Sequence, residues 1–173
     1  EEYVESAKSI QPINELSRFG HSVTLRKKKF LSNIFFNLVN SNNAILFGGA
    51  KGYSSSYDIK NDTYIFKTKE STWVKINPGG DIPPPRAAHA ACAINEEHLA
   101  IFGGAGEGCE LVPDDLYILE ISLNKTNCIW YKIPTEGPGP GQRYGHVLIY
   151  YEPYLLIFGG NLGNSLTNKV ILH

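Results

Sequence analysis

Short apolar runs alternate along this chain with turns that are rich in glycine, proline and polar residues. The runs have the length of strands and show no helical period, so we predict short antiparallel β-strands joined by tight turns. Three of the runs end in the same tripeptide, Phe47-Gly48-Gly49, Phe102-Gly103-Gly104 and Phe158-Gly159-Gly160. The tripeptides lie 55 and 56 residues apart, a spacing typical of a repeat architecture.

The run before each tripeptide is apolar at every position and not only at alternate positions, at residues 44–47, 99–102 and 155–158. A strand that is wet on one face would alternate, so these strands should be covered on both faces. Sheets stacked around a central axis satisfy this requirement, because each sheet packs on two neighbours. The predicted fold is therefore all-β, a propeller with three four-stranded antiparallel blades visible.

Each repeat begins at an arginine that is followed three residues later by a histidine, in the pairs Arg18 and His21, Arg86 and His89, and Arg143 and His146. We assign residues 1–17 to the outer strand of a preceding blade and a linker, 18–85 to repeat one, 86–142 to repeat two and 143–173 to an incomplete repeat three. Repeat one carries an insertion at residues 26–41. Repeat three lacks a fourth strand, and we predict Val170 as its counterpart of Tyr64 and Tyr117.

Two residue types should hold the blades together. The glycine doublets end a strand where the backbone needs a positive φ or a close approach that a side chain would prevent. Trp73 and Trp130 fall on the predicted outermost strands, where a large ring can seal the gap between blades.

Composition narrows the function classes. The net charge is −1, from 16 basic and 17 acidic residues, so no global field favours nucleic acid or an anionic membrane. No apolar run reaches the length of a membrane span. The three cysteines form no CxxC pair, which favours the reducing cytoplasm or nucleus. The chain starts at Glu1 and has no methionine, so we expect a segment of a longer protein.

The order of Arg-x-Gly/Ala-His, a strand ending in Gly-Gly, Asp-x-Tyr and then Trp resembles the kelch repeat over residues 18–173. The resemblance implies a kelch-type β-propeller of which this chain is half of a six-bladed ring. Three longer phrases resemble the N-terminal kelch domain of the kelch-containing Ser/Thr protein phosphatases of plant brassinosteroid signalling and of apicomplexan parasites. They lie at residues 84–89, 115–119 and 137–147, the last with Gly159-Gly160-Asn161 after it.

This resemblance implies a protein-interaction module, the regulatory or substrate-docking part of a phosphatase. The metal-ligand motifs GDxHG, GDxxDRG and GNHE are absent from the chain, so the catalytic domain and its two divalent metals, such as Mn, are expected outside it. The chain itself is then no enzyme and holds no cofactor. The alternatives are a stand-alone kelch adaptor and, more distantly, a kelch-type metal oxidase. The oxidase would need His21, His89 and His146 to converge, although they fall in separate blades.

Partner contacts are expected on one face of the propeller. In an antiparallel hairpin the start of the first strand and the end of the second lie at one edge, so the arginine linkers share a face with the loops after Gly-Gly. Loops on a rigid scaffold carry recognition, and Arg and Tyr are common anchors. We predict contact to a protein partner or phosphoprotein substrate by Arg86, Arg143, Tyr53, Tyr57, Lys51, Glu107, Asn161 and Asn164.

Half a ring should leave an apolar blade face bare at each end. Contiguous exposed apolar patches are rare on monomers. We therefore expect either a homodimer of two half-propellers or further blades of a longer chain to cover these faces.

Overall fold

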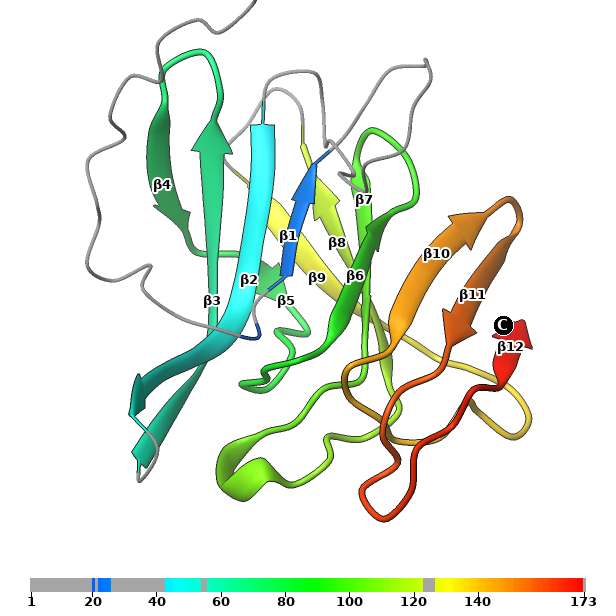
Figure 1. Ribbon diagram of the computed structural model, residues 1–173. Helices are drawn as coiled ribbons and strands as arrows, with labels where there is room; N and C mark the ends of the chain where they lie inside the picture. The colour runs from blue at the N-terminus through cyan, green and yellow to red at the C-terminus, as the bar shows by residue number, and fades with distance from the viewer. Residues whose placement is uncertain (1–19, 21, 26–42, 54–55, 123–126, 173) are drawn as a thin grey trace, which may run out of the picture.

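The computed structural model describes residues 20, 22–25, 43–53, 56–122 and 127–172. Their strands form three separate sheets that fan out around a common centre (Figure 1), so the predicted all-β propeller architecture is confirmed. The predicted strand at residues 3–7, Arg18, His21 and the insertion at 26–41 lie outside the described residues. No helix in the described part of the chain is long and apolar enough to cross a membrane.

Blade 1 is a four-stranded antiparallel sheet in the order β1 (Ser22–Leu25), β2 (Asn43–Tyr53), β3 (Ser56–Lys67) and β4 (Thr72–Ile76). We expected its second strand to end at Gly48-Gly49. The strand instead passes through an irregularity between Phe47 and Gly49 and keeps its pairing with β3 up to Tyr53 and Ser56. The expected loop around residues 51–57 is thus a two-stranded arm that projects from the blade (Figure 1).

Blade 2 follows the same plan with strands β6 (Ala90–Ala93), β7 (His98–Phe102), β8 (Leu116–Ile121) and β9 (Cys128–Ile133). A short strand that the sequence analysis missed, β5 (Gly79–Gly80), joins its outer edge and runs parallel to β9. A 3-10 turn, η2 (Glu107–Cys109), lies in the loop between β7 and β8.

Blade 3 has three strands in the described residues, β10 (Val147–Tyr151), β11 (Tyr154–Phe158) and β12 (Val170–Leu172). Its register corrects one prediction. Tyr64 pairs with Leu46 and Tyr117 pairs with Ile101, and the equivalent partner of Ile157 is Ile171. The counterpart of the two tyrosines is therefore Ile171 and not Val170. The register of β12 against β11 is shifted by one residue from the register that we assumed.

The first strands of the blades lie side by side, with β6 between β1 and β10 (Figure 1). Apolar side chains fill both gaps between blades. Ile45 and Phe47 of blade 1 pack with Trp130 of blade 2, and on the other side Phe102 packs with Leu148 of blade 3. Strand β7 of blade 2 is buried on both faces, which accounts for its uninterrupted apolar sequence at residues 99–102.

The outer face of blade 3 is bare among the described residues. Phe158 is 50% exposed there, whereas the equivalent Phe47 and Phe102 are 0% and 2% exposed. The opposite end of the molecule differs from our expectation, because Leu46 and Tyr64, which point away from blade 2, are buried. Among the described residues, an open apolar face is thus found at blade 3 and not at blade 1.

Candidate functional site

The two predicted contact arginines form the joints between blades. Arg86 has no exposed surface. Its guanidinium Nη1 donates to the carbonyl of Gly103 in its own blade at 3.1 Å, and its Nε donates to the carbonyl of Pro84 at 3.2 Å. Its own carbonyl accepts a hydrogen bond from the N–H of Gly49 in blade 1 at 2.9 Å. One residue therefore ties two successive Gly-Gly turns together.

Arg143 repeats this arrangement one blade further on. Its Nη1 donates to the carbonyl of Gly159 at 2.9 Å, and its carbonyl accepts from the N–H of Gly104 at 2.8 Å. Burial lowers the pKa of both guanidinium groups from the usual value, although neither loses its charge at neutral pH. Both side chains are turned into the protein, so the expectation that Arg86 and Arg143 contact a partner is wrong.

The glycine doublets are the receiving half of each joint. Their residues, Gly48, Gly49, Gly103, Gly104, Gly159 and Gly160, all have positive φ. A Cβ at Gly48 would lie 2.7 Å from the carbonyl oxygen of Arg86, and one at Gly104 would lie 2.8 Å from that of Ala87. Only glycine permits this combination of backbone angle and close approach.

The repeated histidines pack against the neighbouring blade. The His89 ring meets the Phe47 ring edge-on at 5.5 Å, and the His146 ring meets Phe102 in the same way at 5.5 Å. His89 Nε2 is also 2.7 Å from the hydroxyl of Ser22. Burial lowers the pKa of His146 to about 4, so its imidazole is neutral at physiological pH. We expected these rings to bond backbone within their own strands, whereas the structure directs them across the gap.

Large aromatic side chains complete the gap between blades 1 and 2. Trp130 is fully buried, and its ring lies 5.0 Å from that of Phe47. The Tyr117 ring lies beneath the guanidinium of Arg86, with 5.1 Å between the ring centre and the guanidinium carbon.

Aromatic contacts also occur within blade 1. Trp73 packs on Phe66, and the Lys75 ammonium lies 5.8 Å from the centre of the Tyr64 ring.

The loops after Gly-Gly gather at one end of the molecule. Figure 1 shows the arm of β2 and β3, the η2 loop and the loop after β11 at the same end. The backbone bridges between Ala87 and Ala105 and between Tyr144 and Asn161 hold the arginine linkers beside these loops. The predicted shared face is therefore present in the structure.

A groove of about 460 Å³ opens on this face between blade 1 and blade 2. The arm forms one wall, the linker before Arg86 forms the base and the η2 loop forms the other wall. Its lining residues are Tyr57, Asp58, Ile59, Pro84, Pro85, Gly106, Glu107, Glu110, Leu111, Val112 and Pro113.

The structure divides the remaining predicted contact residues into three groups. Tyr57 and Glu107, which are 50 positions apart in the sequence, both line the groove. Lys51 lies in the arm directly opposite Asp58, and Tyr53 ends β2, although its side chain lies outside what the structure describes.

Asn161 and Asn164 belong to the loop after β11 and do not line the groove. Asn161 is a structural residue, since its amide donates to the hydroxyl of Tyr144 at 2.8 Å and its Oδ1 accepts from the N–H of Gly163 at 2.8 Å. Asn164 is exposed. The two asparagines therefore differ, because the first is half-buried and shapes the loop, whereas the second is exposed.

The groove lining also includes Asp58, Glu110 and Leu111, which were not predicted from the sequence. The prolines at 84, 85 and 113, which stiffen the base and the rim, were the available signal for a rigid site here. The two buried cysteines are not reactive thiols, because burial raises the pKa of Cys92 to about 12 and that of Cys128 to about 11. Across the described ranges, no three His, Cys, Asp or Glu side chains are grouped so that they could hold a metal ion.

Comparisons with known proteins agree with this architecture. A family model described as the KLHDC2/KLHL20/DRC7 Kelch-repeats domain matches residues 36–173. The chain is 36% identical over 103 residues to the Serine/threonine-protein phosphatase BSL2 of Arabidopsis thaliana, which is 59% of this chain and 10% of that protein. The predicted resemblance to the phosphatase kelch domain is thereby confirmed.

Other relatives have different names. The Rho GTPase-activating protein gacHH of Dictyostelium discoideum is 36% identical over 137 residues, 75% of this chain and 8% of that protein. The Rab9 effector protein with kelch motifs of Xenopus laevis is 30% identical over 132 residues, 76% of this chain and 34% of that protein. The chain thus spans about a third or less of these relatives. By its match to the family model and by its blades, the chain belongs to the kelch-repeat family, whose repeats serve as protein-interaction modules.

Proposed function

We propose that this chain is the regulatory or substrate-docking kelch domain of a Ser/Thr protein phosphatase whose catalytic domain lies elsewhere in the same protein. The observation that supports it is the 36% identity to a Serine/threonine-protein phosphatase over 103 residues. The two divalent metals of such an enzyme, Mn for example, then belong to the catalytic domain. This chain contributes the loop face and its groove, to which a protein partner or a phosphoprotein substrate binds.

A stand-alone kelch adaptor is the second candidate. The 30% identity to the Rab9 effector protein with kelch motifs favours it, because that likeness covers more of this chain than the phosphatase does. The two candidates differ in what the rest of the protein does and not in the use of this face.

The decisive experiment compares the purified chain with the full-length protein that contains it. Each is assayed with a small phosphate ester and with a phosphoprotein in the presence of Mn²⁺. We expect no turnover by the chain and turnover by the full-length protein. Deletion of the kelch segment should spare turnover of the small ester and reduce turnover of the phosphoprotein. A full-length protein without turnover would support the adaptor instead, and turnover by the chain alone would contradict both.

The open face of blade 3 is proposed to be covered by a further kelch blade of the same polypeptide. In the described joints the second glycine of a doublet, Gly49 or Gly104, donates to the carbonyl of the next blade's arginine. Gly160 is the equivalent donor at the open face. A blade that begins with Arg-x-x-His would complete this joint and place its histidine on Phe158. A second copy of the chain is the alternative occupant. Light scattering of the full-length protein distinguishes the two, because a dimer is expected only if a second copy covers this face.

We also propose that the protein works in the cytoplasm or the nucleus. The three cysteines, Cys92, Cys109 and Cys128, are free thiols, and the exposed Cys109 would be open to oxidation in a secreted protein. Microscopy of the tagged full-length protein tests this, and a secreted product with oxidised cysteines would contradict it.

A further inference from the structure

The groove between blades 1 and 2 has the features of a binding site for an extended peptide. Its base and rim contain Pro84, Pro85 and Pro113, which limit backbone motion. Its volume of about 460 Å³ falls in the range of roughly 300–1,000 Å³ that is usual for binding pockets. Apolar surface is supplied by Ile59 and Leu111, so an occupant can bury side chains there.

The η2 wall of the groove is held in place by its own backbone. The N–H of Gly106 donates to the carbonyl of Glu110 at 2.8 Å, and the N–H of Val112 donates to that of Gly104 at 3.2 Å. These bonds connect the wall to the Gly-Gly joint of blade 2. The wall is therefore organised before any partner arrives, which lowers the entropic cost of binding.

A strand edge lies along the opposite wall. The pairing of β4 with β3 extends only as far as Thr63, and the N–H of Arg86 then donates to the carbonyl of Lys60 at 3.1 Å. Beyond that point, toward the tip of the arm, the described part of the chain places no third strand beside Asp58 and Ile59. An edge of this kind accepts an extended segment of another chain as an additional strand.

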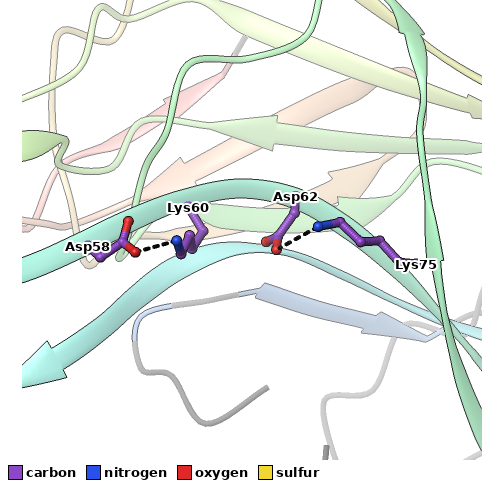
Figure 2. A network of polar contacts seen from close by, with 4 residues as sticks. All are labelled: Asp58, Lys60, Asp62 and Lys75. Atoms are coloured by element: carbon purple, nitrogen blue, oxygen red, sulfur yellow. Dashed lines mark hydrogen bonds and ion pairs between the residues drawn. The ribbon is translucent and has the colours of Figure 1, made fainter. Parts of the chain in front are cut away.

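The charges of the groove select the side chains of that segment. Among the described residues, its lining carries three carboxylates, Asp58, Glu107 and Glu110, and neither lysine nor arginine. Asp58 is bonded to Lys60 of the same strand, as Figure 2 shows. Glu107 and Glu110 are exposed, and within the described residues neither of them forms an ion pair. Within the described residues, these two carboxylates of the η2 wall have no cationic partner, so a basic side chain of an occupant can pair with them.

From this geometry we propose that the groove binds an extended segment of a partner protein that carries lysine or arginine. The segment lies along the edge of β3, its basic side chains pair with Glu107 and Glu110, and its apolar side chains contact Ile59 and Leu111. The inference rests on the proposed function as a protein-recognition module and specifies the chemistry of what is recognised.

Selection from a random heptapeptide library displayed on phage tests the proposal with the full 173-residue chain as bait. Peptides enriched in Lys and Arg are expected. Synthetic, fluorescently labelled copies of the selected peptides are then titrated by anisotropy. The double variant Glu107→Gln/Glu110→Gln should bind them about tenfold more weakly, and binding to the wild-type chain should weaken as salt is raised.

The matched control is Glu136→Gln/Glu152→Gln, which removes the same charge from two exposed carboxylates outside the groove. It should leave the affinity within about twofold of the wild-type value. Equal melting temperatures of both variants and the wild-type chain show that the fold is intact.

The groove proposal would be overturned by no enrichment of any peptide, by enrichment of acidic peptides, or by an equal loss of affinity in both double variants. If basic peptides bind equally well to the wild-type chain and to the Glu107/Glu110 variant, recognition occurs elsewhere on the chain and only the groove is refuted. The phosphatase assays use no groove variant, so the proposed function can fail or stand independently of this result.

Discussion

Replacement of Arg86 by alanine tests whether this residue is a joint between blades or a contact for a partner. The substitution removes the donor groups that hold the carbonyls of Gly103 and Pro84 at 3.1 and 3.2 Å. It leaves intact the backbone bond from Gly49 to residue 86. The change in the free energy of unfolding therefore reports the contribution of the guanidinium group, separately from the backbone part of the joint.

The expected magnitude follows from the two lost bonds. A hydrogen bond to a charged group contributes about 1.5–3 kcal/mol, so two of them contribute about 3–6 kcal/mol. Removal of a buried charge also relieves its desolvation cost, which offsets part of that loss. We expect a net destabilisation of about 2–4 kcal/mol, a large share of the roughly 5–15 kcal/mol that stabilises an ordinary domain.

Urea unfolding, followed by tryptophan fluorescence, measures this change directly, because Trp130 lies in the same gap between blades. Arg86→Lys keeps the charge but not the planar fork, so it should recover little of the loss. Lys75→Ala is the control: its ammonium is exposed and lies 3.9 Å from the Asp62 carboxylate (Figure 2), and its loss should cost less than about 1 kcal/mol. An Arg86→Ala protein that unfolds like the wild type but no longer binds its partner would refute the joint and restore the contact role.

Three further predictions concern the joint, the buried histidine and the open face. Gly103 and Gly159 have nearly the same φ, +63° and +68°, but a Cβ at Gly103 would meet the next blade's backbone whereas one at Gly159 comes no closer than 3.3 Å to Thr167. Denaturant unfolding should therefore show a loss of roughly 1–2 kcal/mol for Gly159→Ala and a clearly larger one for Gly103→Ala; equal losses would mean that backbone strain alone matters. His146 has a folded-state pKa of about 4 against 6.5 when unfolded, so its contribution is complete above pH 6.5 and is lost as the pH falls toward 4. The loss is on the order of 3 kcal/mol, and a His146→Gln variant with an equally steep decline in melting temperature would contradict this origin. Light scattering of the isolated chain at micromolar concentration should show association through the face around Phe158, which Phe158→Asp should weaken; a monodisperse monomer with a sharp melt would refute it.

The strand pattern was predictable because it depends on local residue order. The continuous apolar runs at residues 44–47, 99–102 and 155–158 predicted strands covered on both faces, and the glycine doublets predicted the turns between them. The length of β2 was not predictable. Whether a strand stops at Gly48-Gly49 or continues through an irregularity depends on whether β3 stays paired beyond that point, and in blade 1 it does.

The sequence by itself determined the repeat, the fold class and the family, since a period of 55 and 56 residues is visible without any knowledge of contacts. It also indicated the face on which the loops gather. It did not determine the role of Arg86 and Arg143, because their burial depends on tertiary contacts of the guanidinium groups with the Gly-Gly turns, which the residue order does not show.

The groove is likewise a product of tertiary structure. Tyr57 to Ile59 and the residues from Gly106 to Pro113 are about 50 positions apart, and neither segment has a binding motif of its own. They form opposite walls only because two blades meet at a joint that fixes their separation. A pattern along the chain records which residues lie on one strand, whereas the packing of blades decides which surfaces face each other and which side chains remain for a partner.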